Sequence, residues 1–208
     1  MNFNKFLCAA TVLVTLNASA GVGGDTKKTA EQWYREGAAA VEQRRMQQRL
    51  GRGQAKNIIL FVGDGMGVST VTAARILEGQ QKGGQGEENL LSFERFPYTA
   101  LAKTYNTNQQ TPDSAGTMTA MMSGIKTKAG LIGVDATVTR GDCATLEGAQ
   151  IATFLEEAEQ EGLSTGIIST ARITHATPAA TYAHSVDRNY EDDRDGGKFT
   201  YPERCHAN

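Results

Sequence analysis

The feature that most constrains this chain is a short, continuous apolar run at residues 58–62, with the sequence IILFV. A run of this length, apolar at every position, is typical of a strand that is buried on both faces of a sheet. Residues 166–169 (GIIS) repeat the pattern, and residues 101–105 form another expected strand. Each of these segments therefore needs partners on both sides.

Helical patterns alternate with these expected strands. They cover residues 30–50, 69–77, 114–125 and 151–158. Apolar side chains recur three and four residues apart, and we expect Met118, Met121 and Met122 to fill the core. Gly162 is expected to end the last helix. The alternation predicts an α/β fold with a mainly parallel sheet covered by helices on both faces.

The first twenty residues have the composition of a targeting segment. Lys5 is their only charge, an apolar run covers residues 6–16, and Ala18-Ser19-Ala20 precedes Gly21. We predict a signal peptide over residues 1–20, followed by an N-terminal segment and helix over residues 21–54. An N-terminal anchor helix is the alternative. The protein is therefore expected to be exported, either to the periplasm or out of the cell.

The net charge and the cysteines narrow the class of protein to which this chain can belong. A formal net charge of −2 provides no basic surface for nucleic acid. The run at residues 6–16 is too short to span a membrane, and no other segment is apolar and long enough to do so. Cys143 and Cys205 remain after removal of the signal peptide, and an even pair in an exported protein predicts a disulfide. Two unrelated free thiols are the alternative.

Three segments place polar residues where chemistry can occur, and the first is Gly63-Asp64-Gly65-Met66-Gly67. A carboxylate between glycines at the end of a buried strand can approach a metal ion closely. A tight turn capped by Asp64 explains the same residues without any function. The glycine spacing does not match a dinucleotide loop, and no Gly-Lys-Ser/Thr follows, so a Walker-type loop is excluded.

The second segment is the helix start at Asp113 and Ser114. The free N–H groups and the positive dipole end of a helix favour an anion there, either an alkoxide or a bound phosphate. Ser114 would need a base or a metal to become a nucleophile, and Asp113 could orient its surroundings. The structural alternative is that one of the two residues only caps the helix.

The third segment holds Thr174, His175, Thr177 and, further on, His184 and Arg188. In an extended chain His175 and Thr177 point the same way, and a short helix opened at the proline of position 178 would carry His184. The fork of an arginine matches two phosphoryl oxygens, although Arg188 could also be a solvated surface charge. For His184 we expect a structural role.

Together these segments resemble the alkaline phosphatase superfamily. The similarity runs almost continuously over residues 55–188 and includes NIILFVGDGMG, TPDSAGTMTAMMSGIKT and THATPAATYAH. The resemblance implies that residues 55–208 form the N-terminal part of the catalytic domain. It also implies hydrolysis of phosphate monoesters through a phosphoserine, with two Zn²⁺ and one Mg²⁺.

The resemblance assigns roles residue by residue. Asp64 matches the aspartate that bridges the second zinc and the magnesium, Ser114 the phosphorylated serine that ligates that zinc, Thr177 a magnesium ligand, and Arg188 the phosphate-binding arginine. His175 matches a position just outside the metal ligands that is histidine in animal and some marine bacterial enzymes. The spacing of Cys143 and Cys205 resembles the disulfide of that group, and a homodimer is implied only for a full-length protein.

The chain also departs from the family pattern. The remaining family ligands, three histidines, two aspartates and a glutamate, lie downstream of Asn208 in longer relatives. Three ligands do not close a site for two or three metals, so we expect these residues to be inactive alone. A module that binds phosphate or nucleotide without turnover is the alternative function. A related transferase or sulfatase is a third, but the Cys/Ser-x-Pro-x-Arg motif of sulfatases is absent.

Overall fold

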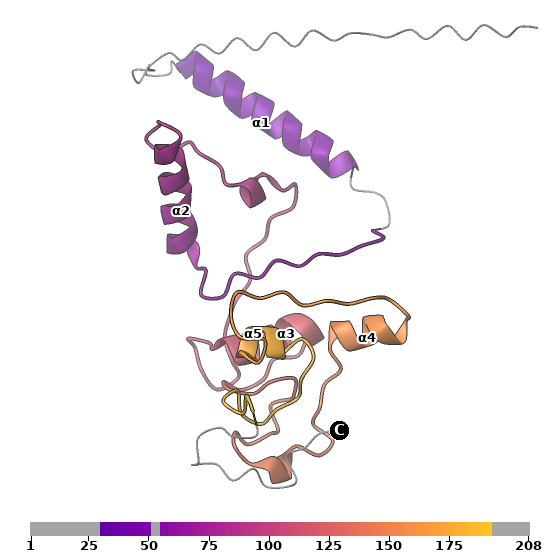
Figure 1. Ribbon diagram of the computed structural model, residues 1–208. Helices are drawn as coiled ribbons and strands as arrows, with labels where there is room; N and C mark the ends of the chain where they lie inside the picture. The colour runs from indigo at the N-terminus through magenta and orange to yellow at the C-terminus, as the bar shows by residue number, and fades with distance from the viewer. Residues whose placement is uncertain (1–29, 51–54, 193–208) are drawn as a thin grey trace, which may run out of the picture. The chain divides into compact units, whose positions relative to one another are not determined.

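A computed structural model of the chain describes residues 30–50 and 55–192 (Figure 1). The chain divides into two units, Met1–Gln54 and Ala55–Asn208. The described part of the first unit is helix α1 (Ala30–Leu50), which confirms the predicted helix. The predicted signal peptide and Cys205 lie outside the described residues, so both remain predictions.

The second unit contains short helices joined by long loops. Its described helices are α2 (Val68–Gln81), α3 (Ser114–Ser123), α4 (Phe154–Gln160), α5 (Ala176–Ala179) and two 3-10 turns, Ser92–Arg95 and Cys143–Thr145. The helix α2 continues four residues beyond the predicted end at residue 77, and the following chain folds back on it. A Cβ on Gly79 would lie only 2.5 Å from the Cα of Gly86. The side chain of Asn89 also donates to the carbonyl of Arg75 at 3.1 Å.

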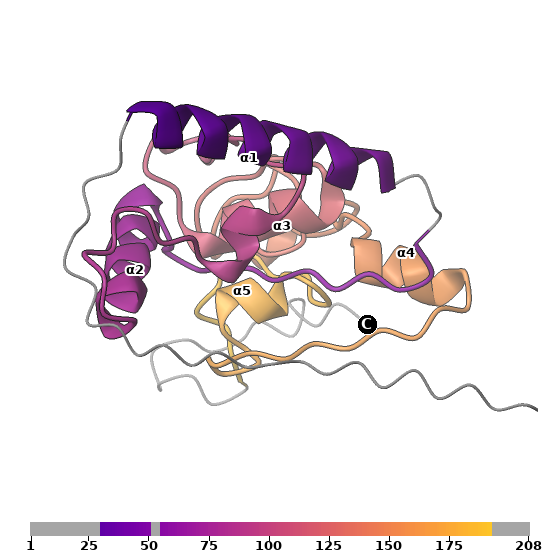
Figure 2. The same ribbon diagram turned by 90° about the horizontal axis from the view of Figure 1, so that it is seen from above.

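Helices α3 and α5 pack against each other, and α4 contacts α3 on another side (Figures 1 and 2). Met118 and Met122 on α3 are buried against α5, as predicted, whereas Met121 is 53% exposed. The helix ends at Ser123, two residues earlier than predicted. Gly124 adopts a left-handed conformation there, with φ of 76°, and its N–H binds the carbonyl of Ala120.

A second apolar cluster forms inside the loop that follows α3. Its members come from residues 131–149 and from the segment before Arg188: Leu131, Val134, Val138, Cys143, Leu146, Ala149 and Val186. The loop is held by isolated bridges, Ile132 with Ser185 and Val134 with Gln150. The packed part of the molecule is therefore built from loops and short helices.

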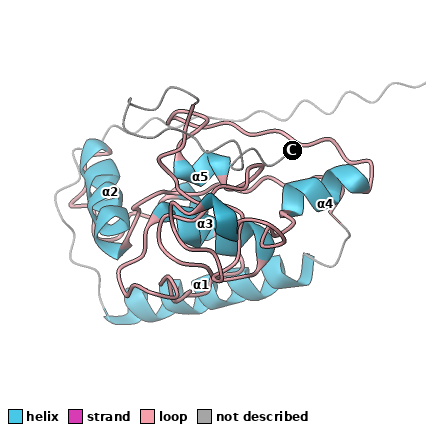
Figure 3. Ribbon diagram, turned by 90° about the horizontal axis from the view of Figure 1, so that it is seen from below, coloured by secondary structure: helices cyan, strands magenta, loops and turns pink. Residues whose placement is uncertain are grey.

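The predicted strands are not formed in this structure. Residues 30–50 and 55–192 contain no strand (Figure 3), and the run at residues 58–62 makes no backbone hydrogen bond to another described segment. Ile58, Ile59, Leu60 and Phe61 are 70%, 79%, 62% and 88% exposed. A strand of a parallel sheet needs neighbours that accept and donate along both edges. Because the described residues supply none, the apolar runs stay extended and exposed, and the parallel sheet remains a prediction.

None of the helices in the described ranges combines the length and the apolar character that a membrane crossing requires.

Candidate active site

The site is built around the start of α3, where Asp113 is the helix cap. Its backbone is extended, with φ of −99° and ψ of 164°, and its Oδ1 accepts the N–H of Gly116 at 3.1 Å. The hydroxyl of Thr117 donates to the carbonyl of Asp113 at 2.8 Å. Ser114 is therefore the first helical residue, and the cap that we weighed as an alternative is Asp113 alone.

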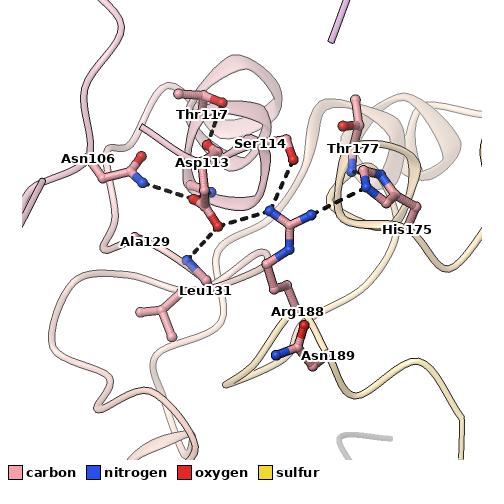
Figure 4. A network of polar contacts seen from close by, with 12 residues as sticks. Asn106, Asp113, Ser114, Thr117, Ala129, Leu131, His175, Thr177, Arg188 and Asn189 are labelled. Atoms are coloured by element: carbon pink, nitrogen blue, oxygen red, sulfur yellow. Dashed lines mark hydrogen bonds and ion pairs between the residues drawn. The ribbon is translucent and has the colours of Figure 1, made fainter. Parts of the chain in front are cut away.

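The carboxylate of Asp113 also binds three residues outside α3 (Figure 4). Its Oδ1 accepts from the side chain of Asn106 at 2.9 Å, while Oδ2 accepts from Gly130 N–H at 2.8 Å and from Arg188 Nη1 at 3.2 Å. Partial burial alone would raise the pKa of Asp113. The hydrogen bonds from Gly116, Asn106, Arg188 and Gly130 outweigh that effect and hold the pKa below its ordinary value.

Arg188 lies between the nucleophile candidate and a histidine. Its Nη1 donates to Ser114 Oγ at 3.2 Å as well as to Asp113, and Nη2 lies 3.3 Å from His175 Nε2. The other nitrogen of the ring, Nδ1, lies 3.5 Å from the backbone nitrogen of Thr177. The remaining N–H groups of the guanidinium have no partner among the described residues. They can meet the oxygens of an anion.

His175 and Thr177 are arranged differently from the prediction. The chain turns at His175, which caps α5 with φ of −60° and ψ of 147°, so the two side chains do not share an extended segment. The helix opens at Ala176, and Pro178 is its third residue. A proline is tolerated there, because N–H groups of the first turn have no partner within the helix.

Asp64 reaches the same place from an extended segment. The hydroxyl of Thr177 donates to Asp64 Oδ2 at 2.7 Å, although the two residues are 113 positions apart. The tight turn that was the structural alternative is also present, since Gly65 has φ of 65° and its carbonyl accepts from Gly67 N–H at 3.0 Å. A carboxylate and a hydroxyl side by side are hard oxygen donors, which suit Mg²⁺.

The described residues do not supply a zinc site by themselves. No group of three or more His, Cys, Asp and Glu side chains gathers within residues 30–50 and 55–192. Zinc sites in proteins use three or four such ligands. The donors present at this place therefore fit magnesium and only a part of a zinc site.

His184 lies apart from this network. Its Nδ1 is 2.6 Å from the carbonyl of Gly133, and its Nε2 is 3.0 Å from Glu156 at the start of α4. The helix that we expected to carry His184 ends earlier, at Ala179. These contacts fit the structural role expected for His184.

Two residues of the site were missed by sequence reasoning, Asn106 and Gly130. Asn106 is only 2% exposed, yet it lies in a polar stretch that is typical of a surface loop. Gly130 binds Asp113 through its backbone N–H. Because any residue except proline has such a group, the sequence does not identify this contact. Cys143 is buried in the second cluster, and its pairing with Cys205 remains a prediction.

Comparison with known proteins shows which family the chain resembles. The family model for alkaline phosphatase matches residues 55–207. The tissue-nonspecific alkaline phosphatase of Gallus gallus is 50% identical over 184 residues, which is 87% of this chain and 36% of that protein. The human tissue-nonspecific isozyme is 52% identical over 148 residues, 71% of this chain and 28% of that protein. The chain thus spans about a third of the length of these relatives.

Solved structures that resemble this chain are also alkaline phosphatases. Alkaline phosphatase from the Antarctic bacterium TAB5 matches 65% of this chain and 34% of its own, with a TM-score of 0.53 and 31% identity. A cold-active alkaline phosphatase from Shewanella gives 0.51 and 32%, over 62% of this chain and 30% of that one. These neighbours have an α/β fold. A variant of the TAB5 enzyme has Mg bound in its M3 site. The chain belongs to the alkaline phosphatase family.

Proposed function

We propose that the protein containing these residues hydrolyses phosphate monoesters, with Ser114 as the nucleophile. The observation that carries this proposal is the position of Arg188, whose Nη1 contacts both Ser114 Oγ at 3.2 Å and Asp113 at 3.2 Å. A cation thereby lies beside the hydroxyl at the N-terminal end of a ten-residue helix. Family membership supports the same reaction class.

In this proposal the Ser114 oxygen attacks the phosphorus in line with the ester oxygen. The bond from phosphorus to the ester oxygen breaks, and the alcohol leaves with a proton. Water then attacks the phosphoserine and releases inorganic phosphate and free Ser114. Arg188 and the first N–H groups of α3 bind the phosphoryl oxygens in both steps, where negative charge develops.

We propose that Asp64 and Thr177 hold Mg²⁺, and that Asp64 and Ser114 contribute to one of two zinc sites. Such ions, when bound, lower the pKa of a hydroxyl and stabilise negative charge. Because the described residues do not complete a zinc site, we expect turnover to require further ligands and the 208-residue chain to be inactive by itself. A zinc titration of the 208-residue chain that produced full activity would contradict this.

We further propose export after removal of residues 1–20, and a disulfide between Cys143 and Cys205. Terminal sequencing of the mature protein should then begin at Gly21. Peptide mass spectrometry without reduction should find the two cysteines linked.

We also propose that the full-length protein is a homodimer. Analytical sedimentation tests this, and a monomer would contradict it.

The test of the function is Ser114→Ala in the full-length, metal-loaded protein. We expect kcat for a phosphate monoester to fall by about a thousandfold or more, because the nucleophile is lost. Inorganic phosphate should still bind, since Arg188 and the helix end remain. Ser123→Ala is the matched control, because this hydroxyl lies at the other end of α3 and donates to the carbonyl of Thr119.

Full activity of Ser114→Ala would end the proposal. If the wild-type protein binds phosphate but turns over no monoester, the binding module without catalysis is the correct function.

A further inference from the structure

The main chain that carries Arg188 is held against the loop of residues 130–141. The N–H of Arg188 donates to the carbonyl of Gly130 at 2.8 Å. Ser185 and Ile132 exchange both of their backbone hydrogen bonds, at 2.8 and 3.0 Å. Backbone hydrogen bonds therefore fix the segment that leads to Arg188, without any contribution from the Arg188 side chain.

A charged pair adds to this docking. Arg140 Nε donates to Asp187 Oδ2, and Arg140 Nη2 donates to Asp187 Oδ1, both at 2.9 Å. This two-pronged geometry restricts rotation of the carboxylate as well as its distance. Because Asp187 directly precedes Arg188, the pair fixes the direction in which the chain enters Arg188.

The guanidinium of Arg140 also packs on Gly130. A Cβ at Gly130, whose φ is +83°, would lie 2.4 Å from the Cζ of Arg140. The backbone of Gly130 in turn binds Asp113 through its N–H and Arg188 through its carbonyl, both at 2.8 Å. Gly130 thus connects Arg140 to both Asp113 and Arg188.

The charge of Arg140 is held by the same neighbours. The hydrogen bonds to Asp187 raise the pKa of Arg140 against the opposing effect of burial, and the negative charge of Asp113 adds to this rise. Arg140 has no contact with Ser114 that could give it a direct part in the reaction.

Partly exposed ion pairs contribute modestly to stability, and a bidentate arginine–carboxylate pair lies at the upper end of that range. The side chain of Arg140 is 42% exposed and that of Asp187 is 16% exposed. A small displacement of a phosphate-binding arginine, by contrast, lowers the rate strongly. Loss of the pair is therefore expected to change catalysis more than folding.

We propose that Arg140, through its bidentate pair with Asp187 and its packing on Gly130, is a positioning residue for Arg188. The proposal rests on the proposed function, in which Arg188 binds the phosphoryl group.

The first experiment compares Arg140→Ala with wild type in the full-length, metal-loaded protein. We expect kcat/KM for a phosphate monoester to fall, and the inhibition constant of inorganic phosphate to rise, each about tenfold. The melting temperature should shift by no more than about 2 °C. Arg45→Ala is the control, because it removes an exposed pair with Glu42 in the other unit. Unchanged kinetics in Arg140→Ala would overturn the proposal.

The second experiment repeats the substitution in an Arg188→Ala protein. If Arg140 acts only by positioning Arg188, Arg140→Ala should there reduce kcat/KM by less than about twofold. A further tenfold loss in that background would show a general structural role and overturn the proposal. Asp187→Asn, which breaks the pair from the other side, should give the same pattern even if Arg140→Ala folds poorly.

Arg140→Lys separates charge from geometry. Lysine keeps the positive charge but not the planar fork, so we expect only partial recovery of phosphate binding. Complete recovery would mean that charge alone is required, which contradicts positioning by the bidentate pair. The proposed function fails separately: if Arg188→Ala keeps full kcat/KM, Arg188 does not bind the phosphoryl group at all.

Discussion

The packed region around Ser114 and the exposed apolar runs at residues 58–62, 101–105 and 166–169 are built in opposite ways. All apolar side chains that are buried in the described ranges lie within residues 115–186. By contrast, Ile58, Leu101 and Ile168 are 70%, 97% and 101% exposed. The first region forms its contacts from neighbouring turns and caps, whereas the second consists of expected strands that have no partners among the described residues.

This difference divides the candidate site. Asp113, Ser114, His175 and Arg188 are held by contacts within residues 106–190, so their geometry is set by the packed region. Asp64 lies in the extended region and reaches the others through one hydrogen bond from Thr177. The anion-binding half of the site is therefore organised locally, and the metal-binding half depends on how the extended region is held.

The largest expected contrast comes from one substitution in each region. Leu131 is 0% exposed and Ile59 is 79% exposed. Leu131→Ala should lower the free energy of unfolding by about 3 kcal/mol, since it leaves a cavity in the second cluster. Ile59→Ala should change it by less than about 0.5 kcal/mol in the 208-residue chain. Urea unfolding of both variants checks this, and equal losses would show that residues 58–62 are buried.

Two glycines of the packed region offer a sharper pair. Gly133 and Gly148 have φ of +60° and +74°, but only at Gly133 would a Cβ meet the backbone, 2.3 Å from the carbonyl oxygen of Ala183. Gly148→Ala should cost about 1 kcal/mol for the left-handed backbone. Gly133→Ala should cost about 2 kcal/mol more, because the chain at Ala183 must move. Similar melting temperatures for the two variants would contradict the close approach.

The buried side chain of Asn106 tests how the packed region holds the site. Asn106→Ala removes the donor to Asp113 Oδ1 and should destabilise the fold by about 1–2 kcal/mol. Asn108→Ala is a useful comparison, because Asn108 accepts only from Ala129 N–H and lies in an exposed position. If Asn108→Ala lowered the free energy of unfolding more than Asn106→Ala, the role of Asn106 in holding Asp113 would be contradicted.

The smallest effect concerns a tie between the two regions. Arg172, beside the exposed run at residues 166–169, donates to Glu191 at 2.6 and 2.8 Å. These bonds, followed by that from Thr174, lower the pKa of Glu191 from 4.5 to about 2. Since the folded pKa is depressed, the contribution to stability is complete above about pH 4.5 and is lost as the pH falls towards 2.

Glu191→Gln should remove that part of the acid dependence while changing stability at neutral pH by well under 1 kcal/mol, about the size of an exposed pair. Unfolding free energies of wild type and variant, measured between pH 2 and pH 6, give the test. Parallel curves over that range would contradict the depressed pKa.

Sequence reasoning succeeded where structure is local. The helix at residues 30–50 and the start of α3 at Ser114 follow from spacing and capping residues. The contact of Arg188 with Ser114 joins residues 74 positions apart, and only the family motifs pointed to a shared site. The strand expected at residues 58–62 is not formed among the described residues and stays a prediction, because an apolar run indicates a need for burial but does not identify the segments that bury it. Sequence reasoning failed for the start of α5, since an N–H at Pro178 is not required in the first helical turn.

Asn106, Gly130 and Arg140 could not be predicted for another reason. Their roles depend on backbone groups and on residues that approach from distant parts of the chain. Arg140 and Asp187 lie 47 positions apart, and no pattern within one sequence relates them.

The most direct test of the central claim is the identity of the phosphorylated residue. Full-length, metal-loaded protein would be incubated with radiolabelled inorganic phosphate and quenched in acid, and the labelled peptide would be sequenced by mass spectrometry. We predict the label on Ser114, with none on Ser123 of the same helix. A label on any other residue, or active protein that never carries phosphate on Ser114, would contradict the claim.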